Sequence, residues 1–121
     1  MFRMIAVLCL ASALGYAESW TGLLVNSKCY AALERNHGPN DTETYVDRDR
    51  NSEIRYCAPN AKTKLFAVVE DTGDQLDFDD AGNAKAADLV KNTGKKRYYP
   101  VVVTGEVTKN TVKVETISAA K

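Results

Sequence analysis

Apolar and polar residues alternate in the second half of the chain, and this pattern predicts most of its regular structure. Residues 65–69 form a short apolar run that ends at the turn 70–74. Residues 75–78 then alternate with a period of two. The two runs predict a β-hairpin in which Leu76 and Phe78 face the core.

A helix is predicted to follow this hairpin. Residues 84–91 place their apolar side chains on one side, Asp80 or Asn83 is positioned as the N-cap, and Gly94 stands just past the end. These signals are typical of the two ends of an α-helix.

A second hairpin is expected at the end of the chain, with a two-residue turn at Lys109-Asn110. This turn implies three cross-strand pairs, Val107 with Val112, Gly105 with Val114 and Val103 with Thr116. Gly105 is a natural place for a β-bulge. Pro100 has no backbone N–H, so it favours an edge or the start of a strand.

The first half of the chain is less regular. Residues 20–29 read as a first strand that runs into Cys29, and residues 33–56 read as a long polar loop with one short helix around 44–50. The predicted fold is therefore mainly β, a small five-stranded OB-like barrel with one helix between strands 3 and 4. A four-stranded sheet with one helix packed on its face is the alternative.

Residues 1–17 have the composition of a secretory signal peptide. Arg3 precedes an apolar run, and small residues precede Glu18. The apolar run is shorter than the roughly 20 residues that span a bilayer. We therefore expect a single domain over residues 18–121, periplasmic or secreted, with no membrane span after cleavage.

The cysteine count supports an exported protein. Of three cysteines, Cys9 lies in the predicted signal peptide, which leaves Cys29 and Cys57 to form a disulfide. Two other interpretations involve His37, the only histidine: a metal site with both cysteines, or a nucleophilic cysteine of a small hydrolase. The disulfide is favoured because the paired knuckles of zinc sites are absent from the sequence.

Three short motifs stand in the mature chain: Trp20-Thr21-Gly22, Ser27-Lys28-Cys29 and Val103-Thr104-Gly105. Together with the signal peptide and the predicted elements, they resemble a family of small exported bacterial proteins classed as a domain of unknown function. Members typically carry W-x-G-x-x-x-D-S-x-C, and here Asn26 stands in place of the aspartate. The second cysteine that members carry close to the later one is absent beside Cys57. The resemblance implies an OB-like barrel in the periplasm or outside the cell, and no established activity.

Candidate binding residues lie in the polar loop. OB barrels bind through the face of their second and third strands and the loops beside it, here residues 65–78 and the loop closed by the cysteines. Arginine and tyrosine are enriched at binding hot spots, and the loop supplies several of them: Tyr45, Arg48, Arg50, Arg55 and Tyr56.

Two further clusters suggest ligands. Asp77, Asp79, Gly82 and Asp88 have the spacing of an EF-hand-like calcium loop, although Ala81 stands where an oxygen ligand is needed. The segment 95–99 places three cations before Tyr98 and Tyr99, a combination that can hold single-stranded nucleic acid. The balance of 16 basic and 16 acidic residues and the predicted export both argue against nucleic acid.

Neither a pair of catalytic carboxylates nor a Ser/His/Asp set stands out. We therefore expect a non-enzymatic, monomeric binding or structural protein of the bacterial envelope without a cofactor. Its partner would be an envelope protein or a small ligand. Trp20 is expected to cap one end of the barrel core, and as a solvent-facing residue it would instead offer a platform for sugars.

Overall fold

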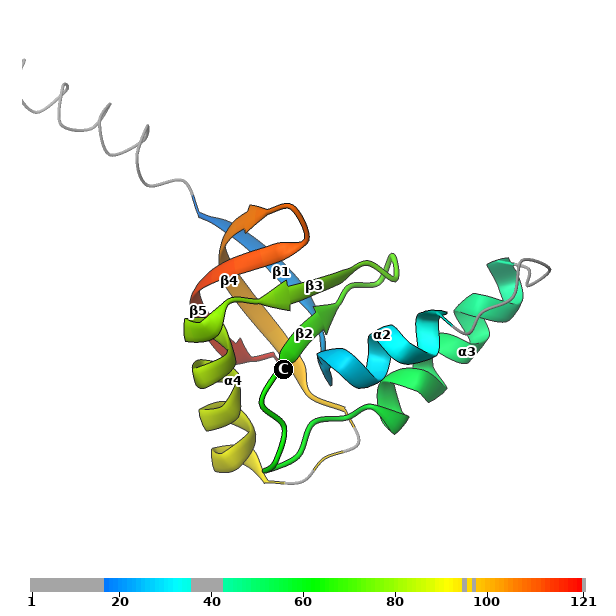
Figure 1. The fold of residues 1–121 in the computed structure, drawn as a ribbon, viewed down its shortest axis with the longest axis horizontal. Coiled ribbons are helices and arrows are strands. Elements are labelled where there is room, and N and C mark those ends of the chain that lie inside the picture. The colour runs from blue at the N-terminus through cyan, green and yellow to red at the C-terminus, as the bar shows by residue number, and fades with distance from the viewer. Residues whose placement is uncertain (1–16, 36–42, 95, 97, 121) are drawn as a thin grey trace, which may run out of the picture.

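The computed structural model describes residues 17–35, 43–94, 96 and 98–120, with the backbone alone at residues 35 and 43–49. Five strands form one mixed sheet, and three helices lie against it (Figure 1). In chain order the elements are β1 (Glu18–Asn26), α2 (Ser27–Arg35), α3 (Glu43–Tyr56), β2 (Phe66–Val69), β3 (Gln75–Phe78), α4 (Asp80–Thr93), β4 (Pro100–Thr108) and β5 (Thr111–Ala119).

The sheet closes on itself in the strand order β1-β2-β3-β5-β4. β1 pairs with β2 through its second half, where Leu24 faces Val68, and with β4 through its first half, where Trp20 faces Val103. Every pairing is antiparallel except the short parallel contact of β3 with β5. β1 is therefore the strand that joins the two ends of the sheet.

The second hairpin follows the sequence prediction up to the bulge. Its turn lies at Lys109-Asn110, and Val107 pairs with Val112 and Gly105 with Val114, as expected. The pairing of Val103 with Thr116 is wrong, because a bulge between Thr104 and Gly105 shifts the register and Val103 faces Ile117. Gly105 has a φ of 157°, and a Cβ there would collide with the carbonyl oxygen of Lys113.

The main core fills the interior of the closed sheet, under α4. Alternate residues of the strands supply it, and Leu76 and Phe78 both face inward as predicted. α4 contributes Ala86 and Val90 from its buried side, and Trp20 packs partly against the cluster from one end. Trp20 therefore contacts the core, while part of its surface stays exposed.

A second core lies on the outer face of β1 and β2, under α2 and α3. Val25, Ala67 and Val69 point to this side, and Tyr30, Ile54 and Cys57 cover them. Figure 1 shows α2 and α3 side by side, on a different side of the sheet from α4. The prediction of a polar loop at 33–56 is therefore wrong. The short helix expected around 44–50 lies within the longer α3, and α2 was not expected. Of the α3 side chains that the structure describes, those of residues 50–56, Ile54 alone is buried, so the sequence there resembles that of a loop.

The connection from β1 to α2 also differs from the prediction. The first strand ends at Asn26, and Cys29 lies in the first turn of α2. The Asn26 side chain caps this helix, because its Oδ1 accepts from the backbone N–H of Cys29 at 3.1 Å. The Ser27 hydroxyl donates to Asp77 Oδ1 at 2.7 Å and so joins α2 to β3.

α4 lies between β3 and β4 as predicted, but it begins earlier. Its N-cap is Asp79, whose Oδ1 accepts from Gly82 N at 2.9 Å, and neither Asp80 nor Asn83 has that role. Asn83 is buried, and its Oδ1 accepts from the backbone N–H of Phe66 at 2.9 Å. Gly94 forms the C-cap with φ 77°, as its position suggested.

Candidate ligand-binding groove

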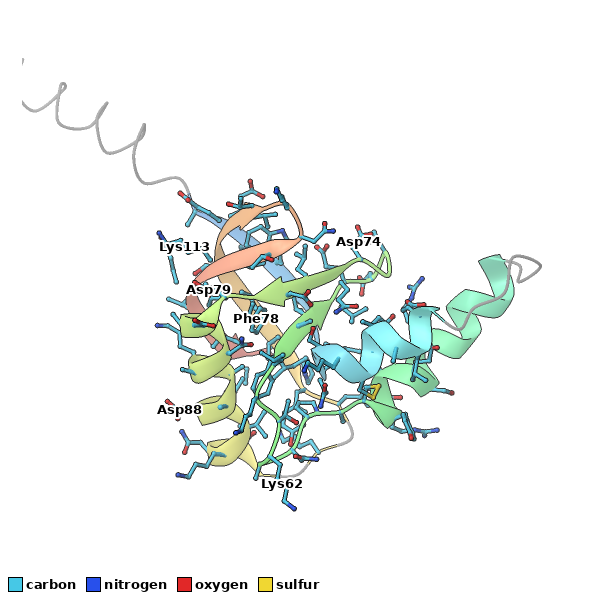
Figure 2. The ribbon with its side chains drawn as sticks, in the orientation of Figure 1. Lys62, Asp74, Phe78, Asp79, Asp88 and Lys113 are labelled. Carbon is cyan, nitrogen blue, oxygen red and sulfur yellow. A yellow bond between two sulfur atoms is a disulfide. The ribbon has the colours of Figure 1, made fainter. Side chains whose placement is uncertain are left out.

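A groove of about 740 Å³ lies where one end of the closed sheet is open. We call it the Trp20 groove. Its rim and floor come from three segments distant in sequence: the start of β1, the β2–β3 turn and the β4–β5 turn. The charged and aromatic residues that line it are Glu18, Trp20, Glu70, Asp74 and Lys109. Figure 2 labels Asp74 on the β2–β3 hairpin.

The groove exists because β2 is short. β2 pairs with β1 only from Leu23 to Asn26, whereas β4 pairs with β1 from Glu18 to Leu23. After Val69 the chain turns back, with Gly73 N donating to Glu70 O at 2.8 Å. Within the described residues, the edge of β1 over 18–22 that faces away from β4 therefore has no partner strand.

Backbone hydrogen bonding shows which groups face this free edge. Leu24 N donates to Tyr99 O at 2.9 Å, in the register in which β1 meets β4. In an antiparallel strand the N–H and C=O of one residue point to the same side, and successive residues alternate. Ser19 and Thr21 therefore direct their backbone groups away from β4, along the groove.

The groove is acidic. Three carboxylates line it, and one ammonium group, that of Lys109, stands against them. Burial raises the pKa of the Glu70 carboxyl above its ordinary value, and the negative charges of Asp74 and Asp71 raise it further. A positive charge placed beside Glu70 would relieve this repulsion.

Arg50 supports the β2–β3 turn from the side of α3. Its Nη1 donates to the backbone oxygen of Asp71 at 2.7 Å, and a Cβ at Gly73 would lie 2.7 Å from its Nη2. Gly73 itself has φ 92°, which favours glycine. Arg50 is half-buried and has a structural role, so removing it would affect the turn.

The structure describes the side chains of three of the five predicted binding residues, Arg50, Arg55 and Tyr56. Arg50 contacts the turn, whereas Arg55 is exposed and Tyr56 is 78% exposed near the end of α3. None of these three lines the Trp20 groove. Tyr45 and Arg48 belong to α3, but their side chains lie outside the described part of the structure.

The disulfide prediction is confirmed. Cys29 and Cys57 are bonded, with their Cα atoms 5.5 Å apart, and the bond joins α2 to the residue after α3. Neither sulfur is then a thiolate that could bind a metal or attack a substrate. His37 lies outside the described residues.

The calcium interpretation does not fit the local structure. Asp77 accepts from Ser27 and Gln75, and Asp79 caps α4, which begins at Asp80 and already contains Asp88. The segment is thus a strand and a helix and has no loop of EF-hand length. Among the described residues, no group of three or more His, Cys, Asp or Glu is placed to hold a metal ion.

The two tyrosines of the basic segment are not a stacking platform. Tyr99 is buried in the main core, and its hydroxyl donates to Gly94 O at 2.5 Å. Tyr98 packs against the second core. Their aromatic faces are therefore used for packing, while Lys95 and Arg97 lie outside the described residues.

The sequence predicted only part of the groove. Residues 70–76 belong to the segment expected to bind, but Glu18, Trp20 and Lys109 join it through the topology of the sheet. An acidic residue two places before a tryptophan, on one face of a strand, is a weak signal by itself. These two residues can be assigned to a site only when the pairing of β1 with β2 and β4 is known.

A comparison of the chain with protein-family models, with curated protein sequences and with solved structures found no match. In the described part of the chain, no helix is both long enough and apolar enough to cross a membrane.

Proposed function

We propose that this protein is an exported OB-like domain of the bacterial envelope that acts by binding, without chemical turnover, and that the Trp20 groove is its binding site. The strand order β1-β2-β3-β5-β4, with α4 between β3 and β4, supports the OB-like assignment. The signal-peptide pattern at 1–17 and the disulfide support export.

The observation that carries the proposal is the groove itself. It is concave, a half-buried tryptophan lines it, and several polar side chains converge on it, as in ligand sites of known proteins. It also lies beside the β2–β3 and β4–β5 turns. This is the part of an OB barrel, near the second and third strands and the last hairpin, that commonly takes part in binding.

A blocking substitution tests whether the groove binds. Val107 lines the groove and is 38% exposed, so Val107→Trp would fill part of it. Glu106→Trp is the matched control, because the neighbouring strand residue points to the opposite face and is exposed. We expect affinity capture from envelope extracts to recover a component with the wild type and with Glu106→Trp, and at least about tenfold less of it with Val107→Trp.

Equal recovery with all three proteins would show that binding occurs elsewhere. In that case the exposed end of α3, with Arg55 and Tyr56, would be the next surface to test. Melting curves of both variants show whether each one folds before capture is compared.

A further inference from the structure

The chemistry of the Trp20 groove identifies the kind of ligand. We infer that an extended, basic segment of a partner polypeptide adds as a strand to the free edge of β1 at residues 18–22 and places a lysine or arginine side chain between Trp20 and the carboxylates of the groove. This inference rests on the proposed function and adds the class of ligand.

The free edge of β1 is the first argument. Ser19 and Thr21 direct backbone donors and acceptors along the groove, where β2 has already ended. Exposed strand edges are templates for another extended chain, and known peptide-binding domains use them in this way. Five strand residues span about 16 Å, so the edge matches a peptide of about five residues.

The charge of the groove is the second argument. Glu18, Glu70 and Asp74 face the space that a peptide on this edge would enter, against Lys109 alone. Acidic linings favour cationic partners and suppress acidic ones. A cationic side chain would also relieve the repulsion that acts on Glu70.

Trp20 is the third argument. It lines the groove and is partly buried, so its position is fixed by the core while part of its surface stays accessible. Tryptophan is the aromatic side chain that attracts a lysine or arginine cation most strongly. Alternate residues of an added strand face the same side as Trp20, so one basic side chain can reach it.

A small amine would satisfy the carboxylates and Trp20 but would leave the backbone groups of Ser19 and Thr21 unused. The strand edge therefore distinguishes a peptide from a polyamine. A neutral sugar could donate hydroxyl groups to the carboxylates, but it carries no positive charge to offset theirs and leaves the strand edge unpaired.

Trp20 is the only tryptophan of the chain, so its fluorescence reports directly on the groove. The probe is the blocked peptide acetyl-Thr-Val-Lys-Val-Lys-Val-Thr-amide, titrated into the mature protein at low salt. We expect a saturable change in Trp20 fluorescence, and at least about tenfold weaker binding when both lysines are replaced by glutamate. Raising the salt concentration should weaken the binding of the lysine peptide, because salt screens the attraction between its charges and the carboxylates.

Protein variants and modified peptides separate charge from strand pairing. The double variant Glu70→Gln/Asp74→Asn should bind the lysine peptide about tenfold more weakly than the wild type. The control Asp88→Asn/Glu115→Gln removes two exposed carboxylates, on α4 and β5, and should bind the peptide as tightly as the wild type. Two further peptides carry N-methyl groups on alternate backbone nitrogens, one peptide on the odd residues and the other on the even residues. Only one of these two sets of N–H groups faces β1 in an added strand, so one peptide should lose binding and the other should keep it.

Three results would overturn the inference. These are equal binding of the lysine and glutamate peptides, equal binding of both methylated sets, and full competition by spermidine with the same dependence on Glu70 and Asp74. If envelope capture still depended on Val107, only the class of ligand would be wrong. If capture were independent of Val107 as well, the proposed function would fail with it.

Discussion

Asp79 stabilises two elements with a single oxygen atom. Its Oδ1 accepts from Gly82 N at the start of α4 and from Val114 N of β5 at 3.1 Å. Gly82 is packed so closely that a Cβ there would collide with the Val114 side chain. The first turn of α4 therefore packs so closely against β5 that only glycine fits at position 82, between Asp79 and Val114.

We expect Asp79→Ala to lower the free energy of unfolding by about 2–3 kcal/mol. An N-cap contributes about 1 kcal/mol, and an unsatisfied buried N–H at Val114 costs about 1–3 kcal/mol. Urea denaturation measures the loss. Asp79→Asn keeps an acceptor and should lose less, and the exposed neighbour Asp80→Ala should change stability by less than about 0.5 kcal/mol. A larger effect at Asp80 would contradict the observed cap.

Glu70 gives the protein a small dependence on pH. Its pKa is raised in the folded state, so the ionised carboxylate opposes folding, fully above the folded pKa and progressively less as the pH falls toward the unfolded value. The charges around it are Asp71 and Asp74 in its own turn, Glu18 on β1, Lys109 on the β4–β5 turn and Arg50 on α3.

Glu70→Gln should therefore raise the melting temperature at pH 7 by about 1–3 °C, since a partly exposed charge contributes less than about 0.5 kcal/mol. The difference from the wild type should disappear near pH 4, where the wild-type carboxyl is largely protonated. Calorimetry at the two pH values measures this, with the exposed Glu115→Gln as control. A gain that is the same at both pH values would exclude the electrostatic cause.

At the scale of elements, the α2–α3 pair depends on the second core and on the disulfide. Tyr30, Ile54 and Cys57 are buried against β1 and β2. Burial raises the pKa of the Tyr30 hydroxyl far above its ordinary value, and the neighbouring Glu34 on α2 raises it further. Apolar contact and one covalent bond therefore both hold the pair in place.

Replacing both cysteines with alanine should lower the free energy of unfolding by roughly 3.5 kcal/mol, as expected for opening a loop with a sequence separation of 28. Hydrogen exchange should rise most in α2 and α3, because the bond joins these two elements. A reducing agent should destabilise the wild type in the same way and have no effect on the double variant. If α4 lost protection before α3, the disulfide would support a different part of the fold.

The strands of the second hairpin and the C-terminal end of α4 were predictable because local signals determine them, whereas the start of α4 was placed too late and its cap is Asp79. Gly94, Gly105 and the Lys109-Asn110 turn fixed those features. The sequence predicts a bulge at Gly105. The predicted pair of Val103 with Thr116 is wrong because the bulge shifts the register by one residue, so that Val103 pairs with Ile117. α3 was predicted only in part, because Ile54 and Cys57 reveal its buried side only when β1 and β2 are in place.

At the scale of the whole molecule, the candidate site could be predicted from the sequence only in part. The order of strands and the disulfide followed from pattern and cysteine count, and both appear in the structure. The Trp20 groove depends on where β2 ends relative to β1, which is a consequence of pairing. The arginines of the polar segment were predicted to bind a partner. In the structure, Arg50 instead supports the β2–β3 turn.

Closure of the sheet by β1 has a consequence for the order of folding. The contact of Glu18 with Gly105 joins the beginning of the domain to a point near its end. Contacts between residues so distant in sequence raise the relative contact order and slow folding, because the intervening chain must lose its freedom before the pair forms. The start of β1 can therefore pair with β4 only when most of the chain is available. If the chain crossed a membrane in extended form, the sheet could not close until β4 had emerged.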